Sequence, residues 1–117
     1  FPLDQPFGYR CSANGRVVVF SGDTCPDDRV IAAARGADVL IHECVEFDKW
    51  RMAGIDTGHM AHALTDAPDF GRVADAAKVG HAVTTHMLAA SEPRDLAARI
   101  RATYAGALTI GADLMTV

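Results

Sequence analysis

The 117-residue chain has no long hydrophobic stretch, no run of like charges and no cluster of basic residues. Its apolar runs are far shorter than the ~20 residues that a membrane helix needs, so we expect neither a membrane segment nor a signal peptide. Lysine and arginine number 11 against 15 aspartates and glutamates, and the sequence therefore does not support nucleic-acid binding by this segment. We expect a cytoplasmic protein that has no membrane partner.

Cysteine is also scarce, with only Cys11, Cys25 and Cys44. An odd number without Cys-x-x-Cys spacing argues against a disulfide framework and against a structural zinc knuckle, so we expect reduced thiols. Half of the residues are hydrophobic, which is enough to build the core of one small domain. Residues 1–117 are therefore expected to form a single region.

The chain is organised around residues 16–24, where an apolar run stops abruptly at Ser-Gly-Asp-Thr. Three valines and a phenylalanine at 17–20 predict a strand that is covered on both faces. Asp23 follows the end of this strand, and Gly22 permits a tight turn before it. Ligands bind beyond the carboxyl ends of parallel strands, which makes Asp23 a candidate site residue. The alternative is that Asp23 only caps the helix that follows.

The rest of the chain alternates strand and helix patterns, which predicts an α/β fold. Further strands are expected at 7–11, 38–44, 81–86 and 107–110, and helices are expected to begin near Pro26, near Thr65 or Asp66, and near Glu92. The Asn-Gly pair at 14–15 predicts a tight hairpin, so the sheet should begin with an antiparallel pair. Residues 45–55 fit either a helix or an active-site loop.

Side chains that can bind a metal follow three of the predicted strands and occupy one loop. They are Asp23, His42, Glu43 and His86, with His59 and His62 in the loop. Parallel strands would gather these groups along one edge of the sheet. Imidazole nitrogen and carboxylate oxygen suit Zn²⁺, iron and manganese also fit, and an aspartate can bridge two ions. His81 starts its strand, which is more typical of a structural histidine.

Five short motifs, in this order, resemble the second half of a metallo-β-lactamase-fold hydrolase, and the most similar branch is the ribonuclease Z and arylsulfatase-like one. They are Ser21-Gly22-Asp23-Thr24, Ala37-Asp38-Val39-Leu40-Ile41-His42-Glu43, His62 with Thr65, Thr84-Thr85-His86 and Ala112-Asp113-Leu114-Met115. The resemblance implies half of an αββα sandwich, with four to five strands and three to four helices. It also implies one or two zinc ions.

The resemblance assigns roles to four residues. Asp23 matches the aspartate that bridges the two metal ions, and His86 matches a ligand of the second metal. Glu43 and His62 resemble the ribonuclease Z pair in which a glutamate orients a histidine that donates a proton to the leaving group. This chain has His62-Ala63-Leu64-Thr65 where the branch usually has His-Ser-Thr, so His59 is an alternative to His62.

The family's first-half signature, His-x-His-x-Asp-His, is absent. The resemblance therefore implies that an N-terminal half of the same domain is a partner, and a homo-oligomer is a further expected arrangement. The expected function is a metal-dependent hydrolase in which a metal-activated water cleaves a phosphodiester, a sulfate ester, a lactone or a thioester. This chain by itself is expected to be inactive, because most of the metal ligands would lie in the other half.

Two other classes of protein stay open at this stage. One is a non-catalytic α/β module for packing or dimerisation, in which a partner covers the exposed sheet edge. The other is a flavodoxin-like domain that binds a small anion at Thr24 and the N-terminus of the next helix. Metal analysis would separate both classes from the hydrolase.

Overall fold

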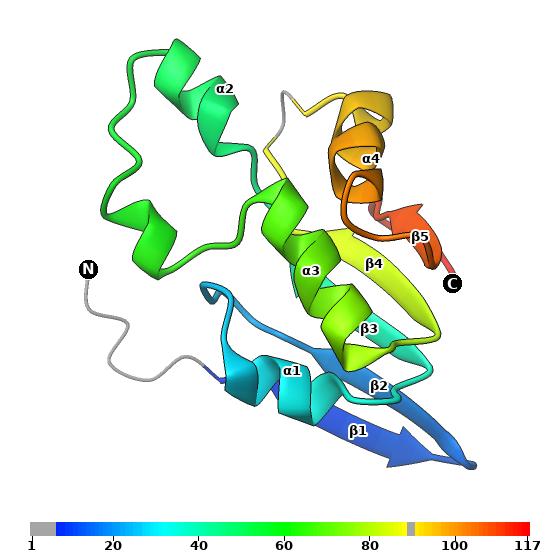
Figure 1. Ribbon diagram of the computed structural model, residues 1–117. Coiled ribbons are helices and arrows are strands. Elements are labelled where there is room, and N and C mark those ends of the chain that lie inside the picture. The colour runs from blue at the N-terminus through cyan, green and yellow to red at the C-terminus, as the bar shows by residue number, and fades with distance from the viewer. Residues whose placement is uncertain (1–6, 89–90) are drawn as a thin grey trace.

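The computed structural model describes residues 7–88 and 91–117, which form one five-stranded sheet with helices packed on it (Figure 1). The strands lie side by side in chain order: β1 (Tyr9–Ala13), β2 (Arg16–Phe20), β3 (Val39–Glu43), β4 (His81–Thr85) and β5 (Ala107–Ile110). β1 and β2 are antiparallel, and the other neighbouring pairs are parallel. The predicted α/β fold and its opening antiparallel pair are confirmed.

The hairpin between β1 and β2 fixes where both strands lie. Asn14 and Gly15 have φ angles of 51° and 73°, the positive values that the two central residues of a type I′ turn require. Ala13 then pairs with Arg16, and Tyr9 pairs with Phe20. Because the turn sets this register, β1 covers residues 9–13 rather than the predicted 7–11.

Three helices, α1 (Asp28–Ala34), α3 (Ala67–Ala77) and α4 (Pro93–Arg101), form a layer on one face of the sheet. α3 packs beside both α1 and α4, which places all three in the same layer (Figure 1). The core lies between this layer and the sheet, and its largest fully buried apolar side chains are Leu40, Phe70, Leu96 and Ile100. A flavodoxin-like domain carries helices on both faces of its sheet, whereas the helices α1, α3 and α4 within residues 7–88 and 91–117 pack on one face, which argues against that alternative.

The opposite face of the sheet is apolar and is partly open. Phe20, Ile41 and Val83 are neighbours across β2, β3 and β4, and they alternate with core residues such as Val19, so they point away from the helices. Phe20 is 41% exposed. The prediction that β2 is covered on both faces is therefore wrong for the part of the chain that the structure describes. Among the described residues, no second sheet of the kind that a sandwich would supply covers this face.

Helix α1 has Asp27 as its N-cap, so Asp23 does not cap this helix, which was the alternative role considered for it. The Asp27 side chain accepts a hydrogen bond of 2.7 Å from the backbone N–H of Arg29. The Arg29 side chain also bonds to Asp27 and lowers the pKa of that carboxyl to about 2. Asp23 lies four residues before the cap and is free for another role.

Residues 46–65 leave the sheet and return to it, forming α2 (Phe47–Met52) and the short 3₁₀ helix η1 (Met60–His62) (Figure 1). Two hydrogen bonds close the base of this excursion, from Val45 N–H to the Thr65 carbonyl (3.0 Å) and from Ala67 N–H to the Val45 carbonyl (3.1 Å). The open question over residues 45–55 is thus decided in favour of a short helix. No helix in residues 7–88 and 91–117 has the length and apolar character to span a membrane.

Candidate metal centre

Asp23 and His86 meet at the carboxyl edge of the sheet. The Nδ1 atom of His86 lies 2.7 Å from Oδ1 of Asp23, although the two residues are 63 positions apart in the chain. Asp23 follows β2 and His86 follows β4, so the contact reaches across the end of β3. Both side chains are accessible, with 41% of Asp23 and 59% of His86 exposed. The predicted proximity of these two residues is confirmed, and their role as metal ligands stays a prediction.

The backbone around both residues adopts unusual conformations. Gly22 has a φ of 65°, and a Cβ atom at this position would lie 2.4 Å from the Phe7 carbonyl oxygen, so only glycine fits. His86 has a φ of 51°, which is uncommon for any residue other than glycine. Such strain persists only where the surrounding structure enforces it, and it is frequent at functional sites. The positive φ ends β4 at the point where His86 contacts Asp23.

Glu43 lies at the end of β3 between those two strands and is 1% exposed. Its Oε1 atom accepts a hydrogen bond of 2.7 Å from the Thr65 N–H, and its own N–H donates to Ser21 Oγ over 3.3 Å. Its other oxygen, Oε2, is buried and has no hydrogen-bond partner among the described residues. Burial therefore raises the pKa of Glu43 to about 8, because water is not available to stabilise the charged form.

His62 and His59 lie on the exposed surface of η1 and at its N-cap. Within residues 7–88 and 91–117, Glu43 makes its side-chain hydrogen bond to the Thr65 N–H and makes none to His62. The structure does not bring the predicted Glu43 and His62 pair into contact. The catalytic roles of both residues stay predictions.

His42, which also stood among the strand-end groups, belongs to the core. It is fully buried, its Nδ1 atom lies 2.7 Å from the Glu43 carbonyl oxygen, and its ring meets Phe70 edge-on at 5.7 Å. Burial lowers its pKa to about 4, so its imidazole is neutral at pH 7. His42 follows the inward alternation of β3, which a strand-end position alone does not predict.

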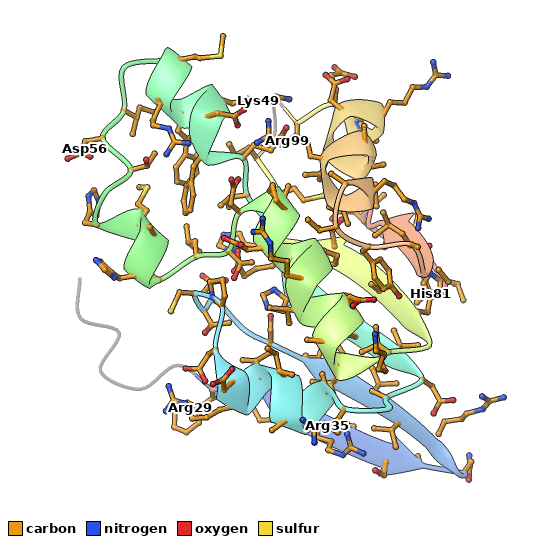
Figure 2. All side chains as sticks on the ribbon, in the orientation of Figure 1. Arg29, Arg35, Lys49, Asp56, His81 and Arg99 are labelled. Carbon is orange, nitrogen blue, oxygen red and sulfur yellow. The ribbon has the colours of Figure 1, made fainter. Side chains whose placement is uncertain are left out.

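His81, labelled in Figure 2, is the first residue of β4, whereas His86 follows the last residue of that strand. Its Nε2 atom lies 2.8 Å from the Thr109 hydroxyl of the neighbouring strand β5. This contact agrees with the structural role expected for it. His81 at the start of β4 and His86 just after its end therefore differ in place and in partner, which makes His81 a suitable control for His86.

The donor atoms present fit part of a metal site. Asp23 offers a carboxylate and His86 an imidazole, the ligand types that suit zinc. A catalytic zinc is usually held by three protein ligands, whereas the described part of the chain has no group of three or more His, Cys, Asp or Glu placed to hold an ion. Cys25 is half-buried, and Cys44 is buried with a raised pKa. A complete site needs donors beyond Asp23 and His86.

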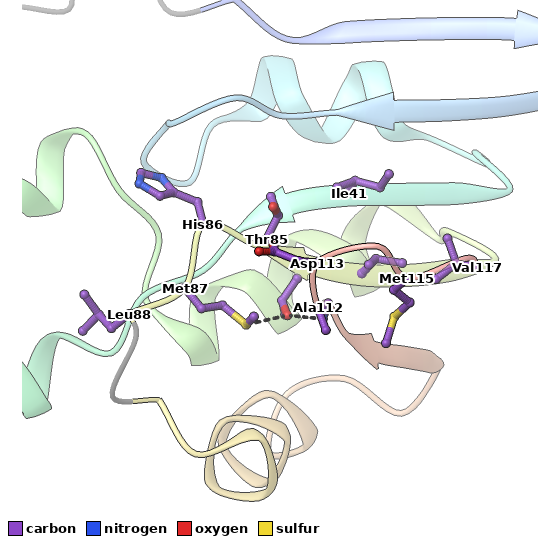
Figure 3. A pocket seen from close by; sticks show the side chains of 12 residues that line it. Ile41, Thr85, His86, Met87, Leu88, Ala112, Asp113, Met115 and Val117 are labelled. Atoms are coloured by element: carbon purple, nitrogen blue, oxygen red, sulfur yellow. Dashed lines mark hydrogen bonds between the residues drawn. The ribbon is translucent and has the colours of Figure 1, made fainter.

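A cavity of about 550 Å³ opens beside His86, between the end of β4 and the C-terminal residues (Figure 3). Its apolar lining includes Ile41, Val83 and Met115, and its polar groups include Asp113. The Thr84 hydroxyl supports this region by donating to Met87 Sδ (3.0 Å) and accepting from the Gly111 N–H (3.1 Å). The candidate metal centre therefore lies at the rim of a space large enough for a small ligand.

Residues 3–87 match the family described as the Beta-lactamase superfamily domain. The chain belongs to this family. Its curated relatives include a protein named ribonuclease Z from Myxococcus xanthus (strain DK1622), which is 32% identical over 105 residues covering 88% of this chain and 33% of the relative. Another is a putative ribonuclease Z from Mycobacterium tuberculosis (strain CDC 1551 / Oshkosh), 30% identical over 99% of this chain and 54% of the relative. The chain thus spans about a third to a half of these two relatives.

Two solved structures have the same fold. The metallo-β-lactamase fold protein YhfI from Bacillus subtilis superposes with a TM-score of 0.68 at 23% identity, covering 85% of this chain and 38% of that one. The short form of human tRNase Z superposes with a TM-score of 0.61 at 20% identity, covering 92% of this chain and 35% of that one. At these identities the likeness concerns the fold. It supports the prediction that the chain corresponds to part of a metallo-β-lactamase sandwich.

The sequence reasoning missed how Ser21 and Thr65 hold this region together. Thr65 was expected only as a helix cap or a motif residue, yet it is fully buried and bonded to both Glu43 and the Thr24 carbonyl. The Ser21 hydroxyl accepts from the Glu43 N–H. These bonds join segments 22 and 41 positions apart, so no local pattern signals them.

Proposed function

We propose that this chain supplies part of the metal site of a metallo-β-lactamase-family hydrolase, and that the complete protein cleaves a phosphodiester. The observation that carries the proposal is the 2.7 Å contact between Asp23 and His86 at the carboxyl edge of the sheet. Similarity to proteins named ribonuclease Z favours a phosphodiester over the sulfate ester, lactone and thioester that the sequence left open.

Asp23 and His86 would hold the metal, most suitably zinc, through a carboxylate oxygen and a ring nitrogen. A bound ion lowers the pKa of a coordinated water towards ~7 and polarises the ester oxygen. The contact with Asp23 fixes the orientation of the His86 ring. An N-terminal half of the domain, or a second copy of the chain, would supply the remaining ligands.

His62 would donate a proton to the leaving group, a role that typically contributes ~10²–10⁴-fold to the rate. Its place on an exposed 3₁₀ helix supports access to substrate. Glu43 would support this segment from its buried side. Its carboxyl accepts a hydrogen bond from the N–H of Thr65, which lies three residues after His62.

The test measures zinc content and hydrolysis of bis(p-nitrophenyl) phosphate by the full-length protein and by the variants Asp23→Asn and His86→Gln. Both variants should lose bound zinc, and their turnover should fall at least about 100-fold. Each variant removes one of the two metal ligands that this chain is proposed to supply. His81→Gln is the matched control, because it changes the histidine at the opposite end of β4 and should keep both properties.

Full zinc content and turnover in Asp23→Asn and His86→Gln would contradict the proposal. Glu43→Gln in the same assay addresses the second pair and should lower turnover while zinc content stays intact. Loss of zinc from Glu43→Gln would instead make Glu43 a ligand or a direct support of one. A sulfate ester supplied in parallel tests the substrate class, and faster cleavage of that ester would overturn the choice of a phosphodiester.

A further inference from the structure

Thr65 is the point at which three separate segments of the chain meet. Its N–H donates to Glu43 Oε1 at the end of β3 (2.7 Å), and its hydroxyl donates to the Thr24 carbonyl in the loop after β2 (2.6 Å). Its carbonyl accepts from the Val45 N–H at the base of the excursion (3.0 Å). The residue is fully buried, so no water competes for these bonds.

The loop that carries Asp23 is tied down on both sides of that residue. Before Asp23, the Ser21 N–H donates to the Ile41 carbonyl (3.0 Å), and the Ser21 hydroxyl accepts from the Glu43 N–H. After Asp23, the Thr24 carbonyl receives the Thr65 hydroxyl. The Thr24 side chain does not add an anchor, because it bonds to the Cys25 carbonyl within the same loop. The second tie therefore comes from Thr65.

Threonine suits this position for a physical reason. Its β-branched side chain has restricted χ1 rotation, so a buried hydroxyl is presented in one fixed direction. The Thr24 carbonyl belongs to the residue directly after Asp23, so the Thr65 hydroxyl restrains the backbone of the loop next to Asp23. This restraint comes from a side chain 42 positions later in the chain than Asp23.

We propose that Thr65 is a positioning residue that aims the Asp23 carboxylate at His86. The expected consequence of this role, tighter metal binding, rests on the proposed function. The geometry of the Asp23 and His86 side chains can be measured without a metal. Glu43 acts with Thr65, because its carboxyl holds the Thr65 backbone in place.

The central variant is Thr65→Val in the full-length protein, which replaces the hydroxyl by a methyl group of similar shape. The Thr24 carbonyl then loses its donor, and the Asp23 loop relaxes. Zn²⁺ affinity, measured by competition with a chromophoric chelator, should fall about 10–100-fold, as is typical when a residue that supports a ligand is lost. Thr65→Ser keeps the hydroxyl and should therefore keep an affinity close to that of the original protein.

Thr109→Val is the matched control, because it removes a half-buried threonine hydroxyl that bonds to His81 in the neighbouring strand. It should leave Zn²⁺ affinity unchanged. If Thr65→Val does not fold, Thr65→Ala removes the same hydroxyl without placing a methyl group against the carbonyl. Loss of affinity in Thr65→Ser or Thr109→Val equal to that in Thr65→Val would overturn the proposal, since the effect would then not depend on this hydroxyl.

A metal-free readout separates this proposal from the proposed function. The ¹⁵N signals of the His86 imidazole report the hydrogen bond at Nδ1, and Asp23→Asn gives their values when the charged partner is lost. Thr65→Val or Thr65→Ala should move these signals towards those of Asp23→Asn, whereas Thr65→Ser and Thr109→Val should not. Unchanged signals in the valine and alanine variants would overturn the positioning role. Failure of the original protein to bind Zn²⁺ would overturn the proposed function alone.

Discussion

Glu43 is the residue whose chemistry departs most from that of a surface group. Its pKa in the folded protein is about 8, against an ordinary value of 4.5, because burial penalises the carboxylate. The unfolded chain gives up this proton at lower pH than the folded chain does. The free energy of unfolding should therefore fall as the pH rises from 4.5 to 8, by at most about 5 kcal/mol.

Urea denaturation of the original protein and of Glu43→Gln between pH 5 and pH 8.5 measures this contribution. The glutamine keeps the size of the side chain and an oxygen for the Thr65 N–H, so the variant should lose less stability than the original protein over this range. His42, whose lowered pKa removes stability as the pH falls from 6.5 towards 4, is present in both proteins and cancels in the difference. Parallel curves for the two proteins would show that Glu43 does not titrate in this window.

At the scale of elements, the strands could be predicted because their signals are local. Apolar runs ending in Ser-Gly-Asp-Thr, His-Glu-Cys and Thr-Thr-His located β2, β3 and β4 to within one or two residues, and the Asn-Gly pair located the hairpin. The same runs placed Asp23 and His86 at one edge, since parallel strands end together. The inward turn of His42 and the ties made by Thr65 could not be predicted, because packing against α3 and bonds across 22 and 41 positions decide them.

Helix α2 shows most clearly how tertiary contacts decide a local structure. Arg99 of α4, labelled in Figure 2, forms ion pairs with Asp48 of α2 and, at 3.9 Å, with Asp66 just before α3. Glu46 at the N-cap of α2 is fully buried, where its Oε2 accepts the Ser91 hydroxyl (2.5 Å) and its Oε1 lies 3.2 Å from Lys49 Nζ. The sequence of residues 45–55 carries no sign of these partners, which is why helix and loop were equally compatible with it.

Arg99→Met should therefore loosen α2 while the sheet stays intact. The only tryptophan of the chain, Trp50, lies in α2 and packs against Phe47, so its fluorescence reports this helix alone. We expect a red shift of its emission and a loss of about 1 kcal/mol in the free energy of unfolding, since the ion pairs are partly exposed. Arg94→Met, an exposed position at the start of α4, should leave the emission unchanged. An unshifted spectrum in Arg99→Met would contradict the role of Arg99 in holding α2.

At the scale of the whole molecule, the described part of the chain forms one helix layer and one sheet of a sandwich architecture. The helices cover one face, and the other presents an apolar row that includes Phe20 and Ile41. The same side of the sheet holds the cavity beside His86. A second layer that covered this face would exclude water from the apolar row and bring further side chains to the metal centre. We therefore expect the segment that covers the open face of the sheet to supply the remaining metal ligands as well.

The 117-residue chain by itself should bind zinc weakly and should have no hydrolytic activity. Two donors, Asp23 and His86, fall short of the three protein ligands that usually hold a catalytic zinc. The open face, on which Phe20 is 41% exposed, should also cause the isolated chain to associate, and Phe20→Lys should reduce that association. The measurements are metal analysis after dialysis against a weak chelator, hydrolysis of bis(p-nitrophenyl) phosphate and analytical ultracentrifugation. Stoichiometric zinc and turnover in the isolated chain would overturn the half-domain interpretation, because Cys25, His59 or Glu43 would then have to act as ligands.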